Sequence, residues 1–415
     1  PGIIMRPDTT CKNQGKKLMI LGGARKSLPL IEYAVEKGYR TILCDYLPDN
    51  PGRLLADEYY SISAADKDLV LELAREKNID GIVSYSSDLL AKTAAFVGNM
   101  LGLPSNPYGS VLTLTRKDLF RNFLKTNGFD CPRSYVFGSF AEAGAQIGDD
   151  MFPVMVKPVD SAGSAGVTKV DSLSRLEEAF EKAMEISGEN KVIVEEYIQM
   201  DHECMIGGDI FVLDGKITFY GLLNSHRGAE FSPFVPTGTS YPIFLCKKRT
   251  EEVHRTLQRA VDLLGMRLGG INVELMYDSR GKLYIEEIAP RNGGNLIPEL
   301  LKTATGADLT AALADASMGV EEIGFGYARP CRYYSTYVIH SETDGILRQI
   351  EYKGDIRDNI IREELYVRHG QKVSRFDSAK KALGIIFLKF RDQEEEVYKM
   401  RNMKKFIDIE LEPDA

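Results

Sequence analysis

The chain has few residues of the kinds that hold structural metals or covalent cross-links. Its 415 residues include five histidines, and no pair of them has the spacing of zinc ligands. The six cysteines form no CxxC pair and no regular framework; they are Cys11, Cys44, Cys131, Cys204, Cys246 and Cys331. A chain of this length does not need disulfides to build a core, so the pattern indicates reduced thiols and a cytoplasmic location.

Long apolar runs and excess positive charge are also lacking. No stretch approaches the ~20 apolar residues that a membrane-spanning helix needs, and no signal peptide is visible, so we expect no membrane association. The formal net charge is −8 and the pI is about 5.4. Such a balance argues against nucleic acid as a partner but leaves room for a local basic pocket. The length suits two or three domains.

The familiar glycine motifs for nucleotides are missing from the first hundred residues. Apolar strands alternate there with helices, which predicts an α/β domain with a doubly wound parallel sheet over residues 16–115, after a loose extension at residues 1–15. Gly22-Gly23 follows the first strand, yet neither the GxGxxG spacing nor a Walker A pattern around Lys26 is present. We therefore expect this domain not to bind NAD through a dinucleotide fingerprint, and not to bind ATP through a P-loop.

A lysine and a loop of small residues occur together further along the chain. The strand at residues 153–158 carries Lys157, and a second strand begins at Val167. The loop between them contains Ser161, Ala162, Gly163 and Ser164. Small side chains leave the backbone N–H groups free to approach a phosphate chain, and a buried lysine needs an anionic partner. The unit predicts a phosphate site.

Two glutamates lie on a predicted hairpin at residues 269–299. If the turn has two or four residues, so that Tyr277 pairs with Lys282, then Glu274 and Glu287 share a face and Glu286 falls on the opposite face. A turn of three or five residues would exchange Glu286 and Glu287. Two carboxylates aimed at one point need a proton or a cation between them, and hard oxygen ligands suit Mg²⁺, with Mn²⁺ as an alternative.

The stretch NVELMYDSRGKLYIEEIAPRNGGN resembles the metal-binding hairpin of the ATP-grasp superfamily, and the resemblance runs in order over residues 17–319. It implies a two-lobed α+β ATP-grasp domain at residues 116–320, with a lid at about 130–197, followed by a small α+β region at 321–415. That last region carries no assignable motif; it either closes the sheet or forms a dimer surface, so a homodimer is allowed.

The resemblance also implies roles for individual residues. Lys117, at the start of a helix, and Lys157 contact phosphates, and the backbone from Glu195 through Glu196 to Ile198 meets adenine. Further implied residues are Glu203 for the ribose, Glu274 and Glu287 for Mg²⁺, Arg291 for the transferred phosphoryl group, and His226, Arg227 and Asn295 for the substrate. His226 and Arg227 lie in a segment at 225–238 that we expect to be an irregular loop. Ala289 departs from the family, which often has asparagine there, so Asn292 or Asn295 is the expected substitute.

The implied chemistry is ATP- and Mg²⁺-dependent formation of an acyl phosphate from a small carboxylate, followed by displacement of phosphate by an amine. No Ser-His-Asp set or activated cysteine is evident. Two alternatives stay open. One is an ATP-dependent carboxylase or phosphoribosylamine-type ligase, for which a basic cluster near Arg25 and Lys26 would be diagnostic. The other is a non-catalytic nucleotide-binding regulator.

Overall fold

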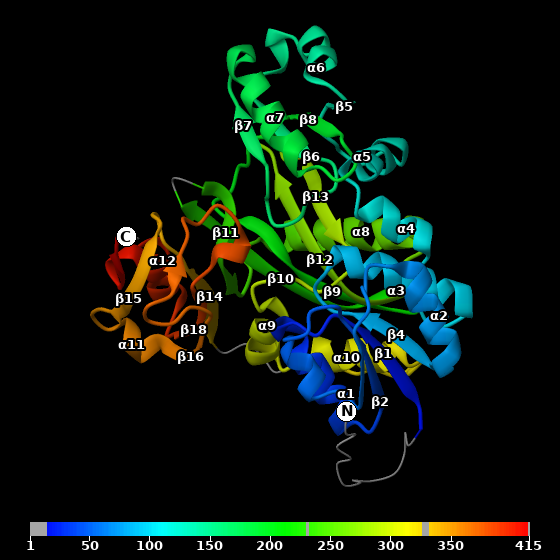
Figure 1. Ribbon diagram of the computed structural model, residues 1–415. Helices are drawn as coiled ribbons and strands as arrows, with labels where there is room; N and C mark the ends of the chain where they lie inside the picture. The colour runs from blue at the N-terminus through cyan, green and yellow to red at the C-terminus, as the bar shows by residue number, and fades with distance from the viewer. Residues whose placement is uncertain (1–14, 230–231, 326–331, 414–415) are drawn as a thin grey trace.

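The computed structural model describes residues 15–229, 232–325 and 332–413 (Figure 1). It contains one parallel sheet and three sheets with antiparallel pairing, so the expected α/β class is confirmed at that level. The predicted extension at residues 1–15 lies, apart from Gly15, outside the described residues. Within the described ranges, no helix combines the length and apolarity needed to cross a bilayer.

The N-terminal sheet is parallel, with strand order β3-β2-β1-β4. Leu18 and Ile20 of β1 pack in the cluster that contains α1, whereas Met19 and Leu21 pack with α2 and α3. Helices therefore cover both faces, as the apolar strand sequence predicts. The elements are β1 Lys17–Leu21, α1 Leu28–Glu36, β2 Arg40–Cys44, β3 Glu58–Tyr60, α2 Lys67–Lys77, β4 Gly81–Ser84 and α3 Asp88–Leu101.

A small antiparallel sheet forms the lobe at the top of Figure 1. Its strand order is β5-β8-β6-β7, and α6 and α7 close its apolar core. Two helices, α4 Tyr108–Leu114 and α5 Lys117–Thr126, lead into this lobe from the N-terminal sheet. The lobe consists of β5 Ser134–Phe137, α6 Phe140–Gln146, β6 Val154–Pro158, β7 Thr168–Val170, α7 Leu176–Ile186 and β8 Val192–Glu196.

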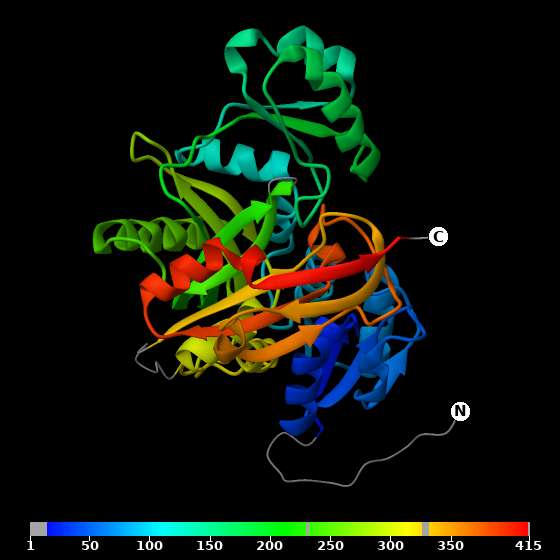
Figure 2. The ribbon, with the colours of Figure 1, turned by 90° about the vertical axis from the view of Figure 1, so that its left-hand side faces the viewer.

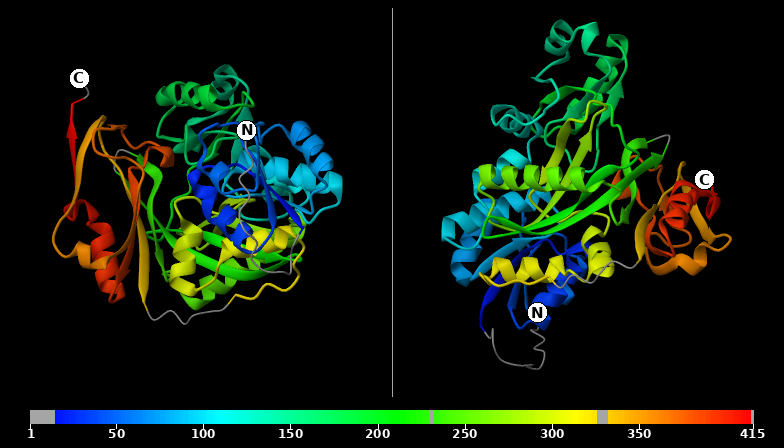
Figure 3. Two further views of the ribbon diagram at one scale, coloured as in Figure 1. Left: turned by 60° about the horizontal axis from the view of Figure 1, so that its bottom comes forward. Right: turned by 180° about the vertical axis from the view of Figure 1, so that it is seen from behind.

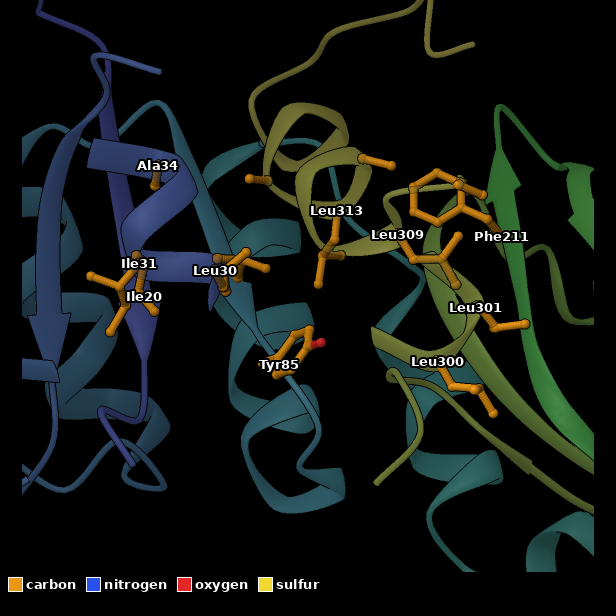
Figure 4. Packing of buried hydrophobic residues seen from close by; sticks show 14 of the residues in the cluster. Ile20, Leu30, Ile31, Ala34, Tyr85, Phe211, Leu300, Leu301, Leu309 and Leu313 are labelled. Carbon is orange, nitrogen blue, oxygen red and sulfur yellow. The ribbon is translucent and has the colours of Figure 1, made fainter. Parts of the chain in front are cut away.

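An antiparallel sheet of order β13-β12-β9-β10-β11-β14-β18-β16 runs through the middle of the molecule. Helix α8 (Lys247–Leu264) packs with Ile271 and Val273 of β12 in one cluster. Helices α9 (Ile297–Thr305) and α10 (Leu309–Ser317) fill the space between this sheet and the N-terminal domain; Figure 4 shows their leucines between Phe211 of β9 and Leu30 of α1. The strands are β9 Met205–Leu213, β10 Lys216–Ala229, β11 Ser232–Tyr241, β12 Leu268–Tyr277, β13 Leu283–Ala289, β14 Tyr333–Ile339, β16 Ile360–Leu365 and β18 Gly384–Phe390.

The C-terminal region extends the central sheet, because β14 pairs with β11 and β18 pairs with β14. This region therefore continues the central sheet, and its role as a dimer surface stays a prediction. A three-stranded sheet of order β17-β15-β19 lies beside it, as Figures 2 and 3 show. Its strands and the nearby helices are β15 Gly345–Tyr352, α11 Ile356–Asn359, β17 Lys372–Val373, α12 Gln393–Arg401 and β19 Ile407–Glu412.

The prediction of an irregular loop at residues 225–238 is wrong. Apart from residues 230–231, which lie outside the described residues, the segment belongs to β10 and β11, which pair antiparallel with register shifts on both sides of Arg227. Pro236 pairs with Arg227 at the irregular position. Proline is tolerated at such bulges, and two prolines in the segment made a strand look like a loop.

Candidate functional site

One solvent-open cavity of about 290 Å³ lies between the small upper sheet and the central sheet. Most of the residues predicted to bind nucleotide or metal line it, from segments up to 170 positions apart. The predicted residues in its wall are Lys117, Lys157, Ser161, Gly163, Ser164, Glu195, Glu196, Ile198, Glu203, Arg227, Glu274 and Glu287. Met155, Met205 and Met276 add apolar wall beside Ile198. Ala162 lines a smaller adjoining cavity with Lys117 and Glu287.

The hairpin places Glu274 directly opposite Glu287, but its turn and its strand register differ from those expected. Tyr277 pairs with Leu283, and the N–H of Asp278 donates to the carbonyl of Lys282, which leaves a three-residue turn. That turn by itself would bring Glu286 opposite Glu274. A β-bulge between Glu274 and Leu275 adds one residue on β13 and restores Glu287.

Glu286 was predicted to fall on the face opposite Glu274 and Glu287, but it lines the same cavity as they do. Its carboxylate is 2.5 Å from Lys157 Nζ and 3.0 Å from Arg121 Nη2. Glu195 contacts the same two cations, with its carboxylate 2.7 Å from Lys157 Nζ and 2.6 Å from Arg121 Nε. Because the bulged residue no longer follows strand alternation, its side chain can turn toward these cations.

The four charges form a neutral, buried set. Burial alone would raise the pKa of Glu286, but the charges of Lys157 and Arg121 outweigh it and lower the pKa to about 2. Arg121 was missed in the sequence. It sits between Phe120 and Leu124 on the buried side of α5, and a charged residue on an apolar stripe is the signal that could have revealed it.

The Glu274–Glu287 pair has donor chemistry that fits a divalent cation. Burial raises the pKa of Glu287 against the opposing charge of Lys117, and the carboxylates of Glu274 and Asp88 raise it further. Arg227 Nη2 lies 2.7 Å from Glu274 and neutralises one of the two acids. The remaining hard oxygen ligands are those that Mg²⁺ prefers. Within the described residues, no three His, Cys, Asp or Glu side chains are grouped to hold a metal by themselves.

The small-residue loop is anchored on both sides of the cavity. Lys117 Nζ donates to the carbonyl of Ser161 at 2.5 Å, and the hydroxyl of Ser164 donates to the carbonyl of Phe234 on β11 at 3.0 Å. Gly163 between them has φ of +65°, a conformation that glycine adopts without strain. The loop therefore bridges α5 and β11 above the lysines.

The predicted ribose acceptor Glu203 has a partner of its own. Its carboxylate forms an ion pair with Arg401, the last residue of α12 in the C-terminal region. Both side chains are more than half exposed. A ribose at this position would therefore compete with the Arg401 guanidinium for the carboxylate.

Besides Ala162, three predicted residues do not line the main cavity. Arg291 forms a two-pronged ion pair with Asp88 of α3, at 3.1 and 3.2 Å. His226 Nε2 lies 2.8 Å from the hydroxyl of Ser240, and burial lowers the pKa of His226 to about 4. Asn295 lies in the loop before α9 with φ of 50°.

Asn292, the other expected substitute for the missing asparagine, donates to Asp209 and not to the acidic pair. Asp209 is fully buried and accepts from the N–H of Gly293 at 2.9 Å with both oxygens. This carboxylate fixes the loop that follows Arg291, and no pattern in the sequence points to it.

Comparison with known proteins gives a consistent family of relatives. The family model for the D-ala D-ala ligase C-terminus matches residues 141–304. A formate-dependent phosphoribosylglycinamide formyltransferase of Wolinella succinogenes is 26% identical over 66% of this chain and 70% of its own length. The N-terminal section of a carbamoyl phosphate synthase large chain of Methanopyrus kandleri is 25% identical over 69% of this chain, which spans about half of that relative. The crystal structure of an L-amino acid ligase from Bacillus licheniformis superposes with a TM-score of 0.80 at 20% identity, covering 97% of this chain and all of that one.

Proposed function

The chain belongs to the ATP-grasp superfamily, and we propose that it is an ATP- and Mg²⁺-dependent ligase that joins a small carboxylate to an amine. The single observation that carries the proposal is the cavity in which two lysines, a small-residue loop and a facing pair of glutamates meet. That combination suits a triphosphate with its cation. The carboxylase-type and regulatory alternatives are not favoured.

Each residue of the cavity has a proposed role. Lys157 and Lys117 bind phosphate oxygens, and the loop at 161–164 covers them. Glu274 and Glu287 hold Mg²⁺, which neutralises charge on the phosphates when it is bound. Adenine lies against Met155, Ile198 and the backbone at 195–198, and its ribose displaces Arg401 from Glu203.

The reaction requires a second group of residues on the far side of the acidic pair. Asp88, the ion-pair partner of Arg291, lines the smaller adjoining cavity together with Glu287, so we place the γ-phosphate at this end, next to Arg291. A carboxylate oxygen of the substrate attacks the γ-phosphorus there, and ADP leaves. Arg291 then binds the acyl-phosphate oxygens while the amine displaces phosphate and releases a proton.

We also propose the division into an N-terminal domain at 16–115, an ATP-grasp domain at 116–320 with its lid at about 130–197, and a C-terminal region at 321–415. The separate parallel sheet and the separate small sheet support the first two boundaries. The continuity of β11 with β14 means that the last boundary divides a sheet. A cytoplasmic location and a homodimer stay predictions.

The proposal is tested by ADP and phosphate release with Mg²⁺-ATP, screened over pairs of amino acids, amines and bicarbonate. We expect Glu287→Gln to lower turnover at least about 100-fold while nucleotide still binds, because the variant loses a metal ligand but keeps the lysines. The exposed Glu181→Gln on α7 is the matched control. Wild-type turnover in Glu287→Gln would show that the acidic pair is not the metal site.

A further inference from the structure

Arg227, a predicted substrate residue, is paired with one of the two proposed metal ligands. Its Nη2 lies 2.7 Å from a carboxylate oxygen of Glu274, and about one-fifth of each side chain is exposed. Both residues line the nucleotide cavity together with Glu287. A cation that binds between the two glutamates therefore competes with the guanidinium of Arg227 for Glu274.

The backbone at Arg227 is irregular, which gives its side chain freedom to change direction. The pairing of β10 with β11 shifts register between His226 and Arg227, and again between Arg227 and Ala229. Bulges of this kind re-aim side chains and are frequent next to active sites. A Cβ built on Gly228 would meet no atom within 4 Å, so the space beside the bulge is open. Arg227 can therefore change partners without breaking a regular strand ladder.

One nitrogen of Arg227 lacks an acceptor. Its Nε is buried and donates no hydrogen bond within the described part of the chain. A buried guanidinium nitrogen without an acceptor is costly, and phosphate oxygens match the donors of a guanidinium well. The partner strand β11 carries Phe234, whose carbonyl accepts from the Ser164 hydroxyl in the small-residue loop. The hairpin that holds Arg227 thus contacts the loop proposed to cover the phosphates.

The charges that line the cavity allow an exchange of partners. The buried set of four charges around Lys157 is neutral by itself. Beside it, Lys117 and Arg227 balance the two metal ligands Glu274 and Glu287. A nucleoside triphosphate with its cation brings net negative charge, which lies on the phosphates. If the cation binds both glutamates, the guanidinium released from Glu274 has phosphate oxygens as its new acceptors, and every charge keeps a partner of opposite sign.

We propose that Arg227 exchanges partners when the nucleotide binds. Before binding it neutralises Glu274; it then yields that carboxylate to Mg²⁺ and donates to the terminal phosphate. Arg227 therefore hinders binding of a cation that arrives without nucleotide, and it stabilises negative charge on the phosphoryl group during transfer. The inference rests on the ligase function proposed above and adds a catalytic residue to it.

The test measures binding of Mn²⁺ to the full chain by electron paramagnetic resonance. Without nucleotide, Arg227→Gln should bind Mn²⁺ at least about 10-fold more tightly than the wild type, because no guanidinium competes for Glu274. With a non-hydrolysable ATP analogue, the affinity of Arg227→Gln for the Mn²⁺–analogue complex should fall about 10-fold. Affinity for Mn²⁺-ADP should not fall, because ADP lacks the terminal phosphate.

These opposite changes distinguish an exchange of partners from a purely structural ion pair, whose loss would not tighten Mn²⁺ binding. Arg227→Lys keeps the positive charge, so its affinity for Mn²⁺ without nucleotide should stay within about 3-fold of the wild type. The matched control is Arg267→Gln, which removes an ion pair with Asp214 in which both side chains are more than half exposed. It should change none of these affinities. Thermal melts verify that each variant is folded.

Three results overturn this inference alone: unchanged or weaker Mn²⁺ binding by folded Arg227→Gln without nucleotide, an equal gain in Arg227→Lys, or an unchanged affinity of Arg227→Gln for the Mn²⁺–analogue complex. Absence of Mn²⁺ binding by the wild type, with the analogue and without it, overturns the metal site of the proposed ligase and this inference with it.

Discussion

Lys157 is expected to be as important for folding as for nucleotide binding. Its ammonium lies 2.7 Å from Glu195 and 2.5 Å from Glu286, and only 6% of its side chain is exposed. Replacing it with methionine keeps the volume but leaves two carboxylates to share Arg121. Removing one partner of a buried ion pair costs about 3–5 kcal/mol, so we expect Lys157→Met to lose that much free energy of unfolding.

A double-mutant cycle with Glu286→Gln isolates the electrostatic part. Since Glu286→Gln removes the surplus negative charge that Lys157→Met creates, the double variant should be more stable than the sum of the single losses by about 1–3 kcal/mol. Urea unfolding measures this through far-UV circular dichroism and tyrosine fluorescence, because the chain has 20 tyrosines and no tryptophan. MgADP affinity of Lys157→Met should fall as well, since uncompensated carboxylates then face the phosphates.

The control is Lys169→Met in the same small sheet. Lys169 is one-third exposed and lies 3.5 Å from Asp171, which is three-quarters exposed, so this surface pair is worth at most about 1 kcal/mol. If Lys157→Met lost no more stability than Lys169→Met, or if the cycle showed additive losses, the buried neutral set of four charges would not exist as described.

Two further predictions concern the C-terminal region. Burial raises the pKa of Glu396 from its ordinary 4.5 to about 8, although Ser335 donates to one oxygen at 2.8 Å. The folded state therefore holds a proton that the unfolded state releases, so the free energy of unfolding should fall as pH rises from about 4.5 to 8. Glu396→Gln should flatten that decline in thermal melts. An unchanged slope would show that Glu396 is not the group that causes it. Arg401 forms an ion pair with Glu203, the predicted ribose acceptor, so Arg401→Gln should raise the affinity for ATP a few-fold at low salt. Weaker ATP binding in calorimetry would show that Arg401 aids nucleotide binding instead.

The local patterns of the sequence were sufficient for much of the fold. Apolar strands alternating with helices gave the parallel sheet, and the acidic hairpin and the lysine before a small-residue loop emerged as separate units. Each depends on contacts between residues that are close in the chain, where periodicity and turn chemistry dominate. The prediction failed for the described part of residues 225–238, because a bulge accommodates proline within a strand.

The sequence did not predict the register of the β12–β13 hairpin or the ion pairs between distant segments. The three-residue turn and the bulge each move the residue opposite Glu274 by one position, and together they put Glu287 there. Counting residues along the sequence detects neither shift. The same bulge turns Glu286 toward Lys157 and Arg121.

The sequence by itself was enough to predict two lysines for phosphates, a loop of small residues and paired acids, because each is a pattern within a short stretch. Only the tertiary structure decided which charges meet, with Glu195 from the small sheet, Arg121 from α5 and Glu286 from the central sheet in one buried set. The physical reason is that the free energy of a buried charge depends on neighbours brought by packing across hundreds of residues, and no local pattern encodes them.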